Sequence, residues 1–126
     1  MTASVEAPRA TEPSRVAVCR LDDLVVERGA AVVVDGRQVA LFRLHDDRVR
    51  ALSNRDPFSG AFVLCRGIVG DRAGRPVVVS PVYKQAFDLE TGRCLDDDAV
   101  GVPVYETAVD HGVVHVTRPG TRALRP

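Results

Sequence analysis

The chain has 126 residues, 45% of them hydrophobic, and its 17 basic and 17 acidic side chains leave a formal net charge of zero at pH 7. This length fits one domain with its own core, and the interspersed acids and bases exclude the basic stripe that nucleic-acid binding requires. No apolar run approaches the roughly 20 residues that cross a bilayer, and the N-terminus lacks a secretory signal pattern, so we expect a cytoplasmic protein without membrane contact.

The two ends of the chain differ in composition from the middle. Residues 1–14 are rich in Ala, Pro, Ser, Thr and Glu, and residues 119–126 contain two prolines and a glycine. Such segments bury too little apolar surface to offset the entropy of ordering. We therefore expect flexible tails at 1–14 and 119–126 around a domain at 15–118.

The three cysteines, Cys19, Cys65 and Cys94, are an odd number without short pair spacing. This pattern favours reduced thiols over a disulfide framework. A free cysteine in a core behaves as a small hydrophobic residue. We expect all three to be structural.

Short β-strands dominate the first half of the domain. Residues 31–44 hold two apolar runs on either side of Asp35-Gly36, a strong hairpin signal. A turn at 45–47 then leads into an alternating segment at 48–52, which predicts a third strand of a meander.

The second half continues in the same way after a stretch that we expect to be irregular. We predict a buried strand at 76–80, a strand at 86–89 that enters a turn at Thr91-Gly92, and a last hairpin of 102–109 and 113–117. No segment of 10 or more residues has a helical apolar period. The prediction is an all-β domain, a small antiparallel sandwich or barrel.

Two loops between strands, at 54–61 and 80–92, resemble the cluster-binding loops of the Rieske iron–sulfur family. In that family one loop supplies Cys-x-His and the other Cys-x-x-His, followed by a Phe-Asp-x-x-Thr-Gly strand and turn. The resemblance places the four ligand positions on Asp56 and Phe58 in the first loop and on Ser80 and Tyr83 in the second. A Rieske centre needs two thiolates and two imidazoles, so we expect no cofactor, metal or catalytic residue on this chain.

Within this family, the sequences of three segments resemble the small subunits of assimilatory NAD(P)H-dependent nitrite reductases. The segments are 54–58, 66–71 and 80–89, and the likeness extends from 16 to 117. The resemblance implies a large catalytic subunit that carries FAD, siroheme and an iron–sulfur cluster and reduces nitrite to ammonium in nitrate assimilation. Electron transfer and nitrite chemistry would then lie on that partner.

Two other functions stay open at this point. A Rieske-type ferredoxin that feeds an oxygenase would share the framework, but the missing ligands disfavour it. A stand-alone protein-interaction module would keep the scaffold for another partner, because a fold alone does not fix a function.

The loops also suggest a docking surface for the partner. Candidate contacts are Phe58, Pro81, Tyr83, Lys84 and Arg66. Aromatic side chains often anchor interfaces, yet both rings would equally fill the space that a cluster leaves. Lys84 is either a rim contact or a solvated side chain. Segment 66–71 is either an interface loop or a segment of tight backbone geometry.

Two further patterns suggest metals, but favour structural roles. His111 and His115 have the spacing of zinc ligands on a helix, yet on a strand they stand about 13 Å apart. Residues 96–98 are three aspartates without the ligand spacing of a calcium loop, so we expect a solvated acidic loop. We expect His45 to be a turn residue.

Overall fold

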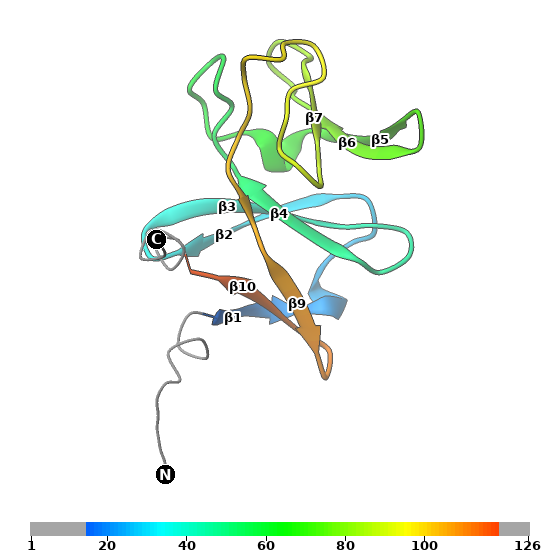
Figure 1. The fold of residues 1–126 in the computed structure, drawn as a ribbon. Coiled ribbons are helices and arrows are strands. Elements are labelled where there is room, and N and C mark those ends of the chain that lie inside the picture. Colours follow the sequence, from blue (N-terminus) through cyan, green and yellow to red (C-terminus); the bar gives the residue numbers. More distant parts are fainter. Residues whose placement is uncertain (1–14, 119–126) are drawn as a thin grey trace, which may run out of the picture.

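The computed structural model describes residues 15–118, and the tails predicted at 1–14 and 119–126 lie outside these described residues (Figure 1). Within them the elements are short strands and two 3₁₀ turns. In chain order they are β1 (Arg15–Arg20), η3 (Leu21–Asp23), β2 (Gly29–Val34), β3 (Arg37–Arg43), β4 (Val49–Ser53), η4 (Leu64–Arg66), β5 (Ile68–Arg72), β6 (Arg75–Val79), β7 (Ala86–Asp88), β8 (Val104–Tyr105), β9 (Thr107–Asp110) and β10 (Val113–Thr117).

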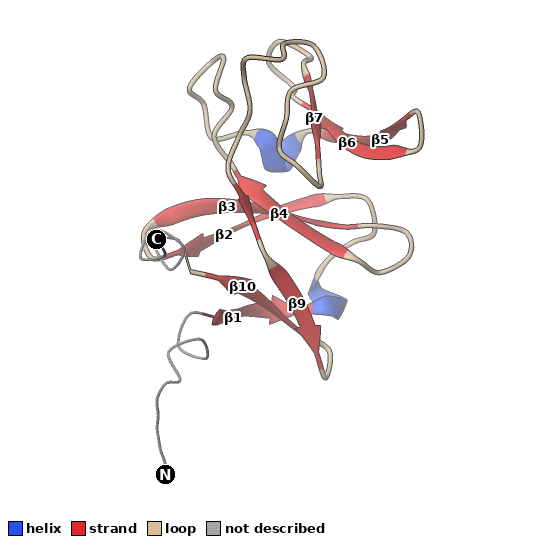
Figure 2. Ribbon diagram, in the orientation of Figure 1, coloured by secondary structure: helices blue, strands red, loops and turns tan. Residues whose placement is uncertain are grey.

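The strands form three antiparallel sheets (Figure 2), which confirms the all-β antiparallel prediction. The orders are β1-β10-β9, β2-β3-β4-β8 and β5-β6-β7. The four-stranded sheet is the middle layer, and one apolar cluster lies on each of its sides. Among the described residues, no helix has the length and apolar character that spanning a bilayer requires.

β3 shows why the middle sheet organises the core. Its Val39 and Leu41 belong to the cluster shared with β10, whereas Ala40 and Phe42 belong to the cluster shared with β6 and β7. Successive strand residues point to opposite faces, so a strand that is covered on both sides reads as a continuous apolar run. This is the run that the sequence shows at Val39–Phe42.

The predicted hairpin around Asp35-Gly36 is confirmed. Both residues have positive φ, 51° and 81°, and the register runs from Val34↔Arg37 to Gly29↔Phe42. Two-residue turns of this kind match the right-handed twist of the paired strands. The meander β2-β3-β4 and the last hairpin, β9-β10, are confirmed as well.

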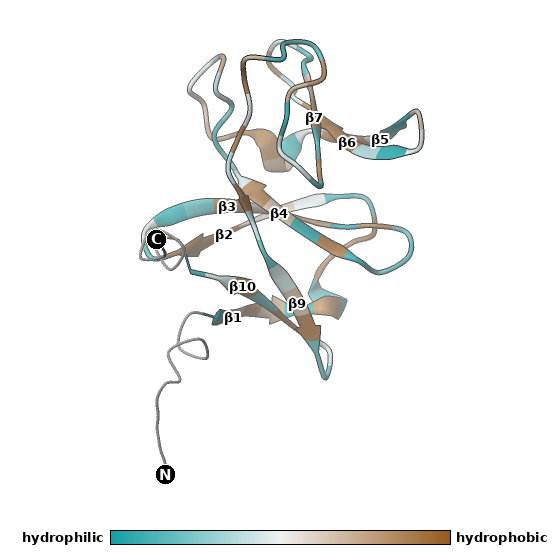
Figure 3. Ribbon diagram, viewed as in Figure 1, coloured by the Kyte–Doolittle hydropathy of each residue, from teal (hydrophilic) through white to brown (hydrophobic). Residues whose placement is uncertain are grey.

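Two predictions of local structure are wrong. The stretch before residue 76 is not irregular throughout, because it contains η4 and strand β5, which pairs with β6. β5 lies at a sheet edge, and Figure 3 shows hydrophilic colouring at the far end of its hairpin, so it carries no apolar alternation. The strand expected at 102–109 is divided at Glu106, since β8 and β9 belong to different sheets.

Candidate functional site

The loops at residues 54–62 and 80–85, here called the first and second loops, lie at the same end of the molecule, beside the third sheet (Figure 1). Asp56 and Ser80 are both fully buried, and the Ser80 hydroxyl donates a hydrogen bond of 2.5 Å to Asp56 Oδ2. The resemblance described above aligns these two positions with the two cysteines of the Rieske family. A direct hydrogen bond therefore joins the loops where thiolates would share one iron.

The second carboxylate oxygen of Asp56 organises its own loop. Oδ1 accepts hydrogen bonds from the backbone N–H groups of Phe58 at 2.8 Å and Ser59 at 3.4 Å. Such aspartate-to-backbone contacts form tight turns without help from a regular element. The carboxylate thus has donors on both oxygens, as a buried acid requires.

Ser80 has the corresponding position in the second loop. Its N–H donates to the Gln85 carbonyl at 2.9 Å, and its carbonyl accepts from Lys84 N at 3.1 Å. Lys84 has a φ of +68°, which lets the chain turn back toward β7. The loop is therefore closed by its own backbone.

The two aromatic positions point to different surroundings. Phe58 is half-buried, packs on the cluster under the third sheet, and places its ring centroid 6.2 Å from that of Phe87. Tyr83 is 60% exposed. Of the two alternatives left open by the sequence, space filling applies to Phe58, whereas Tyr83 remains available to a partner.

The exposed apolar residues of the loops include two that the sequence analysis did not select. Phe62 is 51% exposed and Val82 is 41% exposed. With Pro81, Tyr83 and Lys84, which are also exposed, they form the set that we call the tip surface. Phe62 lies one residue outside the resembling loop, and only its bridge to Arg55 places it at the tip.

Buried polar residues fix the base of the first loop and the turn after β7. Asn54 accepts from Cys65 N at 2.7 Å and donates to Gln38 Oε1 at 3.0 Å. Asp88 is fully buried, and its carboxylate pairs with the Arg75 guanidinium. The sequence offered both residues only as parts of a resembling motif, and their roles appear with the fold.

Comparison with known proteins agrees with this geometry. Residues 14–117 match the family model of the Rieske-like [2Fe-2S] domain. The chain belongs to this family. Its relatives include a nitrite reductase (NADH) small subunit of Escherichia coli, 41% identical over 100 residues that cover 79% of this chain and 93% of that protein.

Two other relatives of this Rieske-like chain are informative. The crystal structure of an NADH-dependent nitrite reductase small subunit from Mycobacterium tuberculosis has a TM-score of 0.81 at 54% identity, covering 82% of this chain and 94% of that one. A nitrite reductase [NAD(P)H] large subunit of Klebsiella oxytoca is 42% identical over 106 residues, 82% of this chain but 11% of that protein. The chain is thus a member of the nitrite reductase small-subunit family.

The residues of this Rieske-like site do not fit a [2Fe–2S] centre. A phenyl ring has no donor atom, and the oxygens of Asp56 and Ser80 already bind each other. Cys19 and Cys94 lie outside both loops, and the half-buried Cys65 follows the first loop without a histidine near it in the sequence. Among residues 15–118, no three His, Cys, Asp or Glu side chains are arranged to hold a metal ion.

The structure separates Arg66 from the tip surface. Arg66 belongs to η4 and lines a groove of about 430 Å³ with residues 27–29 and the start of β5. The proposed docking residues therefore fall into three places: Pro81, Tyr83 and Lys84 on the tip surface, Phe58 against the core, and Arg66 in this groove.

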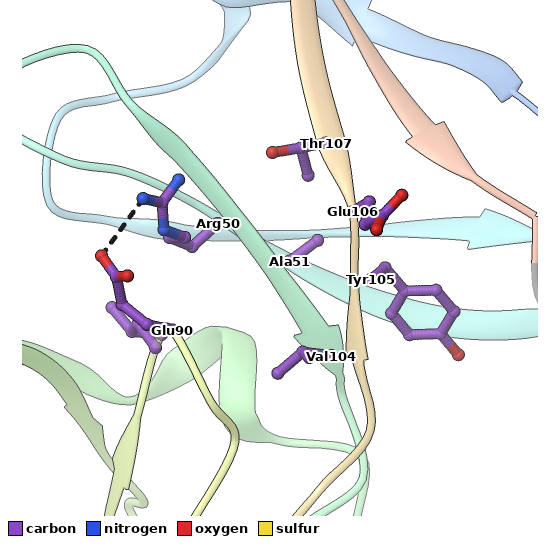
Figure 4. Close-up of a pocket in the computed structure, with 8 residues that line it drawn as sticks. Arg50, Ala51, Glu90, Val104, Tyr105, Glu106 and Thr107 are labelled. Carbon is purple, nitrogen blue, oxygen red and sulfur yellow. Dashed lines mark hydrogen bonds and ion pairs between the residues drawn. The ribbon is translucent and has the colours of Figure 1, made fainter.

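A different groove, of about 490 Å³, lies where the middle sheet meets the loop after β7 (Figure 4). In it Arg50 forms an ion pair with Glu90 at 3.1 Å, and Arg48 reaches the same oxygen at 3.0 Å. The Thr107 hydroxyl donates to the Val49 carbonyl at 2.7 Å. The arginine pairs with Glu90 join the middle sheet to the loop after β7, whereas the Thr107–Val49 hydrogen bond joins the middle sheet to β9 of the first sheet.

The remaining candidate residues have structural surroundings. His111 lies in the β9-β10 turn with a φ of +52°, and His115 lies on β10, so the helical zinc spacing does not apply.

Asp96 is more than a solvated acid, because its Oδ2 accepts a hydrogen bond from Ala86 N at 2.8 Å and so holds the start of β7. Burial, with a smaller effect of Asp23, raises the pKa of the Cys19 thiol.

Proposed function

We propose that this chain is the cofactor-free, non-catalytic small subunit of an NAD(P)H-dependent nitrite reductase. Its partner is a large subunit that binds FAD, siroheme and an iron–sulfur cluster and reduces nitrite to ammonium. The observation that carries the proposal is the Asp56–Ser80 hydrogen bond, which links the two loops in a chain whose relatives are nitrite reductase small subunits.

The large-subunit relative of Klebsiella oxytoca supports the partnership. A segment similar to this chain is covalently part of a protein named a nitrite reductase large subunit. Fusion keeps two domains together permanently and provides one copy of each. We therefore propose a noncovalent complex with equal numbers of the two subunits.

The tip surface is the docking site in this proposal. It presents Phe62, Val82 and Tyr83 beside the cation of Lys84. Aromatic side chains bury a large area for few rotatable bonds, and they often dominate interface energies. Because the hydrogen bonds of Asp56 and Ser80 fix both loops, the surface is ordered before binding, which lowers its entropic cost.

The observations disfavour the two other functions, a Rieske-type ferredoxin and a stand-alone interaction module. A ferredoxin must exchange electrons through its cluster, and the four ligand positions here offer no thiolate or imidazole. A stand-alone interaction module does not explain why a similar segment is fused to a reductase. The three free cysteines fit a reducing compartment, and we propose the cytoplasm.

Co-purification from the native host tests the proposal. Tagged chain is expected to bring down a large flavin- and siroheme-containing protein in equal amount, while the isolated chain is colourless and free of iron. The Tyr83→Ala variant is expected to recover less of the partner, and Val109→Ala, an exposed valine on β9, serves as the control. Stoichiometric iron with a Rieske-type spectrum in the isolated chain would contradict the proposal.

A further inference from the structure

β5 is an edge strand whose outer backbone groups bind no other strand among residues 15–118. It pairs with β6 on one side, and residues 15–118 provide no strand on its other side. The two-residue turn at Ala73-Gly74 makes Arg72 and Arg75 a hydrogen-bonded pair. Hydrogen-bonded and non-hydrogen-bonded pairs alternate along an antiparallel ladder, so the N–H and C=O of Val69 and Asp71 point away from β6. Pro76, which has no N–H, stands opposite Asp71, as this register requires.

The outward groups have no partner in the described part of the chain. Neither Val69 nor Asp71 makes a backbone hydrogen bond outside its own hairpin. Proteins usually protect such an edge with lysine, proline, a bulge or a covering loop. The first half of β5 has none of these, and its Ile68 side chain is 74% exposed.

A groove runs along this edge. One hollow, of about 430 Å³, extends from Cys65 to Val69, and a second, of about 340 Å³, extends from Val69 to Gly74. Both share Glu27 and Val69 in their walls. The floor is closed because Gly29 passes against the Cys65 carbonyl, where an added Cβ would come within 2.1 Å of the oxygen.

Two arginines at one end of the groove form no ion pair within residues 15–118, and Glu27 of the same hollow pairs with His45 instead. Arg28 and Arg66 line it and are exposed, and neither has an ion pair or side-chain hydrogen bond within residues 15–118. Two free guanidinium groups favour a carboxylate, which guanidinium binds with two parallel hydrogen bonds. The free edge requires an extended backbone beside it. Together they specify an extended peptide with an acidic side chain.

We infer that an extended segment of the large subunit adds to the free edge of β5 and places an acidic side chain at Arg28 and Arg66. This inference rests on the proposed function, and it describes a second contact in addition to the tip surface. Backbone hydrogen bonds to Val69 and Asp71 provide the affinity, and the two arginines fix the direction and register of the bound segment.

Amide exchange and charge reversal test this contact with the isolated large subunit. In the free chain the Val69 and Asp71 amides are expected to exchange rapidly, and in the complex to exchange at least about tenfold more slowly. The double variant Arg28→Glu/Arg66→Glu is expected to raise the Kd roughly tenfold or more. Arg37→Glu is the control for each single variant, Arg28→Glu and Arg66→Glu, because Arg37 is also exposed and lies in the β2-β3 hairpin, away from β5 (Figure 1).

Each other outcome overturns the inference in a recognisable way. If the wild-type chain binds the large subunit while both amides exchange as in the free chain, the edge is not used and the proposed function stands. If the wild-type chain does not bind at all, the proposed function fails first. Protection that grows with the concentration of the free chain would identify a second copy of this chain as the occupant.

Discussion

The hydrogen bond between Asp56 and Ser80 is the contact whose removal is expected to damage the tip most. In Asp56→Ala the buried Ser80 hydroxyl loses its acceptor, and the Phe58 N–H loses a bond of 2.8 Å. An unsatisfied buried group costs about 1–3 kcal/mol, and the half-buried N–H adds about 1 kcal/mol. We expect the free energy of unfolding to fall by about 2–4 kcal/mol, which lowers the Tm by roughly 10–20 °C.

A double-mutant cycle isolates the pair from the rest of the loop. Ser80→Ala alone is expected to cost about 1.5–3 kcal/mol, because the carboxylate keeps its two backbone donors. In Asp56→Ala/Ser80→Ala the orphaned hydroxyl is absent, so the double variant should be at least as stable as Asp56→Ala, and its cost should lie well below the sum of the two single costs.

Urea unfolding of the isolated chain, followed by circular dichroism, provides the four free energies of this cycle. Arg55→Ala is the control, since Arg55 is exposed in the same loop and its side chain makes no hydrogen bond or ion pair within residues 15–118, so its loss is expected to change stability by less than about 0.5 kcal/mol. If the cost of the double variant equals the sum of the two single costs, the two side chains are not coupled. The Asp56–Ser80 hydrogen bond would then not be the link between the loops.

Three further predictions follow from burial, backbone geometry and ionisation. Phe58→Ala is expected to lower the unfolding free energy by about 2 kcal/mol, because the ring is half-buried. Tyr83→Ala is expected to change it by under about 0.5 kcal/mol but to weaken binding of the large subunit. Urea unfolding measures the effect on stability, and titration calorimetry measures the effect on binding. Gly92→Ala places a Cβ 2.1 Å from a carbonyl oxygen at a φ of +80°, so we expect the free energy of unfolding to fall by more than about 2 kcal/mol. Gly36→Ala has a similar φ of +81° but no atom near the added Cβ, so we expect a fall of about 1 kcal/mol. Urea unfolding measures both. The raised pKa of Cys19 means that folding favours its neutral thiol. This stabilisation is present below the ordinary pKa of 9.0 and is lost as the pH rises through the higher pKa of the folded state. In unfolding measured at several pH values, the Cys19→Ala variant should therefore lose less stability than the wild-type chain between neutral and strongly alkaline pH.

Local signals in the sequence were sufficient for the β2-β3 and β9-β10 hairpins and for the buried strand β6. Asp35-Gly36 supplies two residues that tolerate positive φ, and the apolar run of β6 reflects its burial. β5 was missed because an exposed edge strand needs no apolar alternation. The Asp56–Ser80 contact joins residues 24 positions apart, so only the packed sheets bring the two side chains together.

The first loop and the turn after β7 are held by the same arrangement of hydrogen bonds around a buried aspartate. Asp56 and Asp88 are both fully buried, and each uses Oδ1 to accept from the backbone N–H groups two and three residues later. In each, Oδ2 binds a side chain from another segment, Ser80 for Asp56 and Arg75 for Asp88. The turns are thus fixed locally, and the cross-links fix where the loops lie. A surface held in this way depends on carboxylates rather than on iron, so docking by the tip surface should persist in the presence of an iron chelator.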